Sequence, residues 1–210
     1  MFKGSDIFEK HYIDYCDRIS EIDMNAVKEI LGAGLEENTL HIRFFNRNYR
    51  ISGDGITDEE GAVPHYGICV ILAKYVLHCP ARLYHDPEWA SFKDFKKDSH
   101  FTNTNYFSSD TEQAILKHFS GRVDALKTAG NKISGQPVSS DFSASYDLSM
   151  AFEVLPRLSL LLLFNDRDEE FPAQCTVLFH RHAEYYLDPE SLLMTSAALA
   201  RRLVDADRNK

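Results

Sequence analysis

Two consecutive segments in the last third of the chain constrain its fold most strongly. From Tyr146 to Val154 apolar and polar residues alternate, which indicates a strand with one buried and one polar face. Pro156-Arg157 then predicts a tight reversal, and the segment from Leu158 to Phe164 is apolar on both faces. A strand without a polar face belongs in the centre of a sheet, so these segments predict an antiparallel hairpin around which the sheet is built. A third strand is expected from Cys175 to His180.

A second hairpin is predicted nearer the N-terminus. Leu40, Ile42 and Phe44 alternate with polar residues, which is typical of a half-buried strand. Residues 46–48, Asn-Arg-Asn, are expected to form the turn because asparagine tolerates positive φ, and residues 49–52 return as the second strand. Residues 53–61 are expected to form a polar loop.

Helices are predicted before, between and after these strands. Apolar spacing and capping residues indicate helices at 6–22, 23–31, 66–78, 109–129 and from 188 onward. The order favours the α+β class, with one antiparallel sheet of about four to five strands packed with helices, rather than a βαβ fold. We expect one domain over 1–210, with an N-terminal helical and hairpin subregion at 1–80 and a C-terminal sheet and helix at 140–206.

Composition and charge limit the partners and the cellular location that we expect for this chain. The chain has 23 basic and 32 acidic residues, and a formal net charge of −9 repels phosphate backbones, so no nucleic-acid partner is expected. Its apolar runs fall short of the roughly 20 residues that span a membrane, so no membrane association is expected. The first residues lack the apolar segment of a signal peptide, which predicts a cytoplasmic protein. The four cysteines form no C-x-x-C pair and are expected to be reduced thiols.

The last third also carries a family resemblance. The residues concerned are Asp141, 146–158, 160–164, 168–173, 177–179 and 186–187. This pattern resembles the uncharacterised prokaryotic family called domain of unknown function 3786. The resemblance implies an anaerobic setting, because some members follow a four-cysteine iron–sulfur domain of the kind found in corrinoid proteins. It implies a non-catalytic accessory or ligand-binding module in redox or corrinoid-type metabolism, with an iron–sulfur or corrinoid protein as candidate partner, and it leaves any cofactor unknown.

Carboxylates offer an alternative function, a small enzyme with acid/base chemistry. Glu153 lies on the polar face of the predicted strand, and Asp141 and Asp54 lie in predicted loops that could approach it. Two carboxylates that meet in one site acquire different pKa values and can divide the roles of acid and base. Glu153 with Asp141 or Asp54 is therefore the candidate catalytic group.

Histidines offer a third function, handling of a metal or cofactor. His65 and Cys69 are four residues apart at the start of a predicted helix and therefore face the same way. His180 and His182 are two residues apart and would share one face if the strand continues. Imidazole and thiolate bind zinc, iron or cobalt, so these four residues are the candidate metal ligands.

Aromatic residues are concentrated between residues 81 and 108. This stretch is expected to cover the apolar helix at 66–78, either as closed core or as the wall of a ligand pocket. The candidate pocket residues are Tyr84, Trp89, Phe92, Phe95 and Tyr106.

Overall fold

The computed structural model describes residues 6–96, 111–138 and 143–209. Within these ranges the chain forms six α-helices and two antiparallel sheets, which confirms the predicted α+β class. Two candidate site residues, Asp141 and Tyr106, lie outside the described residues. None of the helices in the described part of the chain is long and apolar enough to cross a membrane.

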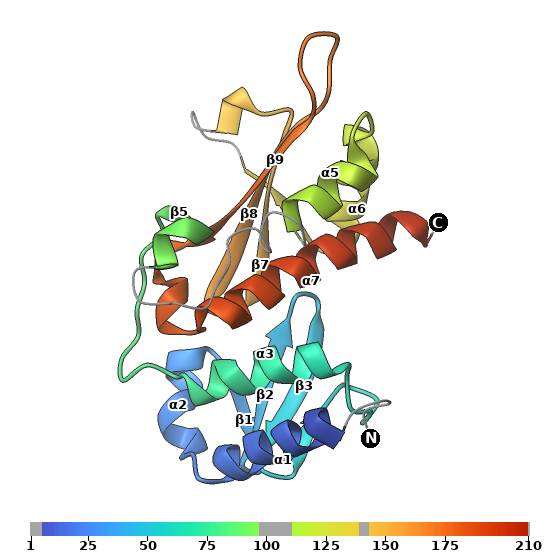
Figure 1. Cartoon of the computed structure of the whole chain (residues 1–210). Helices are drawn as coiled ribbons and strands as arrows, with labels where there is room; N and C mark the ends of the chain where they lie inside the picture. Colours follow the sequence, from blue (N-terminus) through green and yellow to red (C-terminus); the bar gives the residue numbers. More distant parts are fainter. Residues whose placement is uncertain (1–5, 97–110, 139–142, 210) are drawn as a thin grey trace.

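The first sheet has four strands in the order β1-β2-β3-β4. The predicted hairpin forms its centre, as β2 (Thr39–Phe44) and β3 (Arg47–Ser52), and short strands β1 (Gly34–Glu36) and β4 (Gly55–Thr57) extend it. Strand β4 lies where a polar loop was expected. Helices α1 (Asp6–Ser20), α2 (Met24–Leu31) and α3 (Tyr66–Leu77) pack with this sheet (Figure 1).

The turn between β2 and β3 differs from the prediction at 46–48. Strand β3 already begins at Arg47, and the residue with positive φ is Phe45, at 54°. The N–H of Phe45 donates a 2.9 Å hydrogen bond to the carbonyl of Val154 in the second sheet, and its ring meets Phe44 edge-on. A tertiary contact therefore offsets the backbone strain that asparagine was expected to relieve.

The second sheet has the order β5-β9-β8-β7-β6. Its strands are β5 (Trp89–Ser91), β6 (Gln136–Pro137), β7 (Leu148–Leu155), β8 (Leu158–Asn165) and β9 (Gln174–His180). Strand β8 is central and buried from Leu160 to Phe164, as predicted. Strand β5 and the 3-10 helix at Phe92–Lys96 lie within the aromatic-rich stretch.

The prediction of a single helix at 109–129 is wrong. The structure has two helices, α5 (Gln113–Phe119) and α6 (Val123–Lys132), and Gly121 separates them with φ of 78°. The carboxylate of Asp166 accepts hydrogen bonds from the N–H groups of Gly121 and Val123. The break therefore follows from a left-handed residue and a side chain that caps α6 from another element.

Helix α7 (Pro189–Arg208) packs against α3, α5 and α6 (Figure 1). It begins where predicted, because the carboxylate of Asp188 accepts from the N–H of Ser191 at 2.8 Å. The same carboxylate lies 3.1 Å from the ammonium of Lys74 in α3. Burial alone would raise the pKa of Asp188, but the bonds from Ser191 and Lys74 hold it below the ordinary value.

The two sheets share one continuous hydrophobic core. Where they meet, the side chain of Arg157 in the β7–β8 turn donates to the carbonyls of Glu29 and Ile30 at the end of α2, at 2.8 and 3.1 Å. The hydroxyl of Tyr75 donates to Leu31 at 2.7 Å. The bonds of Arg157 fix the second sheet on α2, and the bond of Tyr75 ties α3 to the same end of α2.

Candidate functional site

A groove of about 680 Å³ lies where the two sheet units meet. We call it the junction groove. One wall is helix α7, and the opposite wall is formed by the start of α3 and the β2–β3 turn. Its residues from outside α7 are Phe44, Asn46, Arg47, His65, Gly67, Ile68, Ile71, Lys132 and Ile133.

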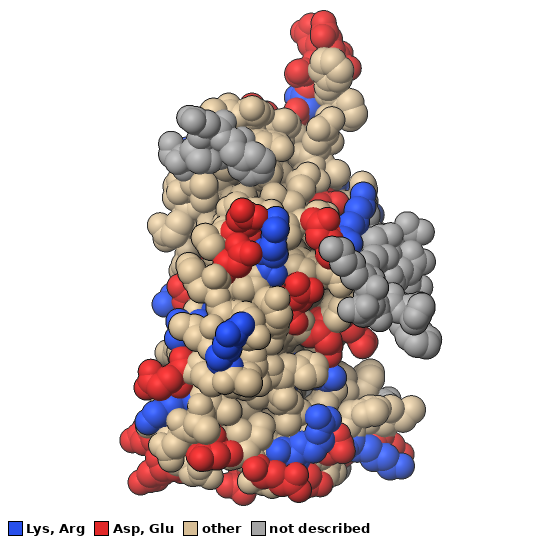
Figure 2. All heavy atoms as spheres, turned by 90° about the vertical axis from the view of Figure 1, so that its left-hand side faces the viewer, with Lys and Arg blue, Asp and Glu red and all other residues tan. Residues whose placement is uncertain are grey.

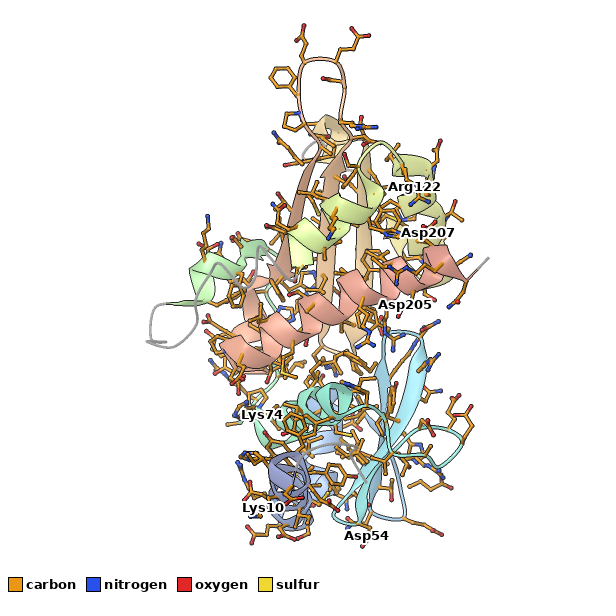
Figure 3. The ribbon with its side chains drawn as sticks, turned by 45° about the vertical axis from the view of Figure 1, so that its right-hand side comes forward. Lys10, Asp54, Lys74, Arg122, Asp205 and Asp207 are labelled. Atoms are coloured by element: carbon orange, nitrogen blue, oxygen red, sulfur yellow. The ribbon has the colours of Figure 1, made fainter. Side chains whose placement is uncertain are left out.

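One face of α7 lines this groove. Its residues are spaced by three and four positions, which places them in a single stripe along a helix. They are Met194, Ala197, Ala198, Arg201, Arg202, Asp205, Ala206 and Asn209. Along the stripe the side chains change from apolar to cationic, whereas another face of the helix buries Leu192, Leu199 and Leu203 in the core. Figure 3 shows Asp205 on the side of α7 that faces the first sheet.

Arg202 is held in place by the β2–β3 turn. Its Nη1 donates to the side-chain oxygen of Asn46 at 3.3 Å, and its guanidinium lies 4.6 Å from the ring centroid of Phe45 and 5.6 Å from that of Phe44. Burial lowers the pKa of Arg202, Tyr49 raises it and the neighbouring Arg47 lowers it. A partly buried guanidinium thus lies beside a second cation.

The other two arginines of the groove are exposed and weakly paired. The Nε of Arg201 lies 4.0 Å from a carboxylate oxygen of Asp205, and both side chains are more than half exposed. Exposed pairs of this kind contribute about 0–1 kcal/mol. Arg47 pairs with Phe44 through its backbone, and within the described residues its side chain makes no hydrogen bond or ion pair. The groove therefore offers cationic groups that solvent can reach.

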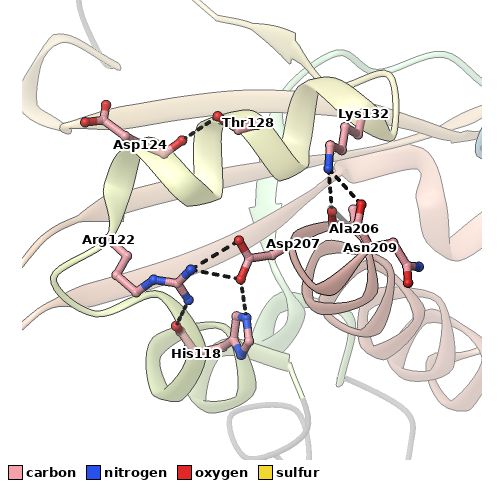
Figure 4. Close-up of polar contacts among 8 residues, drawn as sticks. All are labelled: His118, Arg122, Asp124, Thr128, Lys132, Ala206, Asp207 and Asn209. Atoms are coloured by element: carbon pink, nitrogen blue, oxygen red, sulfur yellow. Dashed lines mark hydrogen bonds and ion pairs between the residues drawn. The ribbon is translucent and has the colours of Figure 1, made fainter.

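The C-terminal end of α7 is tied to α5 and α6 (Figure 4). Lys132 donates to the carbonyls of Ala206 and Asn209 at 3.0 and 3.1 Å. The Nη2 of Arg122 and the Nε2 of His118 lie 3.0 and 2.8 Å from the carboxylate of Asp207. The bond from His118, followed by that from Arg122, lowers the pKa of Asp207. These contacts hold the C-terminal end of α7, which follows the two arginines of the stripe, in position.

The candidate carboxylates lie outside the groove. Glu153 is exposed on β7 opposite Ser159, and Asp54 is exposed in the turn between β3 and β4, at the far end of the first sheet (Figure 3). The two therefore belong to different sheets, and Asp141 lies outside the described residues. The structure does not bring Glu153 and Asp54 into one site.

The candidate metal ligands are divided between two places. His65 caps α3, and its Nδ1 accepts from the N–H of Gly67 at 3.2 Å, while Cys69 is buried one turn later. The rings of His180 and His182 lie 5.2 Å apart, although β9 ends at His180 and a 3-10 helix follows. In the part of the chain that the structure describes, no three histidine, cysteine or acidic side chains form a group that could hold a metal ion.

Both ring nitrogens of the buried His182 are already bonded to backbone. Its Nε2 donates to the carbonyl of Arg157 at 2.8 Å, and its Nδ1 lies 3.0 Å from the backbone nitrogen and 2.7 Å from the carbonyl oxygen of Asp86. His182 therefore ties three segments together. Burial, with His182 and His85 nearby, lowers the pKa of His180 to about 4.

The candidate aromatic residues pack outside the groove. Phe92 and Phe95 are buried, with ring centroids 6.2 and 5.7 Å from that of Phe179. Trp89 lies on His180 at 4.1 Å, and Tyr84 stacks on Tyr185 at 3.9 Å. Tyr106 lies outside the described residues. The described members of this set therefore form ring contacts with neighbouring elements.

The comparisons with known proteins give a family. The family model described as "Domain of unknown function (DUF3786)" matches residues 23–202. The chain belongs to this family. No curated protein and no solved structure matched the chain. In this DUF3786 protein the matched range runs from the cap of α2 to Arg202, and so it includes the lining of the junction groove except Asp205, Ala206 and Asn209.

The arginines of the junction groove were not among the residues predicted from the sequence. Arg201 and Arg202 carry a usable signal, because they continue the spacing that begins at Met194 and convert an apolar stripe into a cationic one. Arg47 carries no such signal, since its place beside Arg202 depends on how the β2–β3 turn meets α7.

Proposed function

We propose that this DUF3786 protein is a non-catalytic, ligand-binding accessory module and that the junction groove is its binding site. The observation that carries the proposal is the position of the groove between the two sheet units. Its walls come from α3 and the β2–β3 turn on one side and from α6 and α7 on the other. A ligand there would contact both units at once.

The size and lining of the groove support this proposal. Sites for small molecules usually enclose about 300–1,000 Å³ and combine an apolar surface with a few polar groups. The junction groove, at about 680 Å³, combines Ile68, Ile71 and Met194 with three arginines. Because a ligand that binds only the folded state stabilises it, occupancy should raise the melting temperature.

The biological setting belongs to the same proposal. We propose a cytoplasmic place in anaerobic redox or corrinoid-type metabolism, with an iron–sulfur or corrinoid protein as partner, as the resemblance implied. The proposed lack of a nucleic-acid partner agrees with the net charge of −9.

A fragment screen by thermal shift tests the proposal. Ala198→Trp places a large ring in the groove, whereas Ala81→Trp adds the same ring at an exposed position outside it. We expect some fragments to raise the melting temperature of the wild type and of Ala81→Trp but not of Ala198→Trp. Fragments that stabilise all three proteins equally, or a screen without any stabilising fragment, would contradict the proposal.

A further inference from the structure

We propose that the ligand of the junction groove carries an oxyanion, a phosphate or a carboxylate, held by Arg47, Arg201 and Arg202 beside an apolar body. This inference rests on the proposed function, because it takes the groove as the binding site. It adds the chemical class of the ligand and the residues that recognise it.

The side chains that line the groove carry a net positive charge, whereas the whole protein is negatively charged. The chain has a net charge of −9, yet four of its cationic side chains line the groove together with a single carboxylate, Asp205. Lys132 already donates to two carbonyls at the end of α7, so the three arginines are the cations that can bind a ligand. Cations that lie close together repel one another, and a bound anion would remove that cost.

The arginines also have suitable geometry. The guanidinium of Arg202 is fixed over the rings of Phe44 and Phe45, so little conformational freedom remains to be lost on binding. Asn46 accepts from one of its five N–H donors and Tyr49 lies nearby, so further donors stay available to a ligand. Planar, forked donors match the oxygens of carboxylate and phosphate groups.

The carboxylate of the groove does not exclude an anion. Asp205 lies at the limit of ion-pair distance from Arg201, so this exposed pair can separate without a large loss of stability.

The apolar part of the groove indicates the chemistry of the part of the ligand that is attached to the oxyanion. Met194 lies eight residues before Arg202 on the same face of α7, a distance of roughly 12 Å along the helix axis. Ile68 and Ile71 of α3 line the same groove, and Ala197 and Ala198 contribute little bulk between the two ends. An apolar group of ring size, attached to the oxyanion, fits this arrangement.

Titration calorimetry at low salt tests the inference with four probes: phenyl phosphate, phenylacetate, inorganic phosphate and the neutral benzyl alcohol. We expect phenyl phosphate or phenylacetate to bind at least about tenfold more tightly than benzyl alcohol and inorganic phosphate, and added salt to weaken binding. The two acids distinguish a phosphate from a carboxylate ligand. The double variant Arg47→Gln/Arg201→Gln should weaken binding at least about tenfold, because both side chains are exposed and their replacement leaves the fold intact.

Arg208→Gln is the matched control, since Arg208 is exposed at the end of the same helix but does not line the groove. It should bind like the wild type. Equal binding of phenyl phosphate and phenylacetate to the wild type and to the double variant would overturn the inference. If fragments bind in the groove but neither acid binds more tightly than benzyl alcohol, the oxyanion is wrong and the proposed function stands. If no fragment and no probe binds, both fail.

Discussion

Replacement of His182 by leucine should destabilise the protein strongly. The side chain is 3% exposed, and its two ring nitrogens hold the backbone of Arg157 and of Asp86. Leucine has a similar volume but makes neither bond. Each lost bond costs about 1 kcal/mol, and the buried polar groups left without a partner add to this loss. We therefore expect the free energy of unfolding to fall by about 2–4 kcal/mol.

Urea denaturation followed by circular dichroism measures this loss. With a slope of about 2 kcal/mol per molar urea, the midpoint should fall by about 1–2 M. His180→Leu is the matched control, because His180 is only partly buried and stacks on Trp89. His182→Gln should lose about half as much as His182→Leu, since its amide can still donate near the position of Nε2. A loss below about 1 kcal/mol for His182→Leu, or equal losses at the two histidines, would refute the reasoning.

Three further predictions concern other parts of the fold. Because the folded-state pKa of His180, about 4, is below the ordinary 6.5, the unfolded chain binds the additional proton and stability should fall as pH drops from about 6.5 to 4. The full pKa shift corresponds to about 3 kcal/mol, and solvent around the exposed part of the ring reduces this contribution to about 1–2 kcal/mol. When unfolding is measured as a function of pH, His180→Leu should lose less stability over the same pH range than the wild type. Gly121→Ala should cost about 1–2 kcal/mol in urea unfolding, because its φ is 78° and the added Cβ would lie 2.8 Å from the Nε of Arg167, whereas Gly34→Ala, without positive φ, should cost less. Glu153→Gln should change thermal stability by less than about 0.5 kcal/mol because the side chain is exposed, and a loss of several kcal/mol would indicate a paired, buried carboxylate.

Sequence patterns predicted those helices and strands that are determined by residues close together in the chain. The alternation in β7, the two apolar faces of β8, and the caps at Asp23 and Asp188 each depend on residues close together in the chain. The strands that escaped prediction, such as β4 and β5, have three residues each and exist because a longer neighbour pairs with them. Pairing of this kind is a tertiary effect that a short sequence window does not contain.

The candidate site was less predictable for the same reason. The histidines at 180 and 182 do lie side by side, but the backbone partners that occupy the ring of His182 come from Asp86 and Arg157. The junction groove depends on Arg47 and Arg202, which are 155 positions apart in the sequence. Single residues in distant segments give no periodic signal, so their meeting becomes visible only once the fold is known.

The projecting turn between β8 and β9 separates two kinds of surface. Asp168, Glu169 and Glu170 gather at its tip, and Figure 2 shows this acidic end standing away from the rest of the molecule. The arginine-lined groove lies at the opposite end of the second sheet, along α7. The acidic tip and the cationic groove are therefore separated along the second sheet. In solution, a small anion would be repelled from the tip and drawn toward the groove.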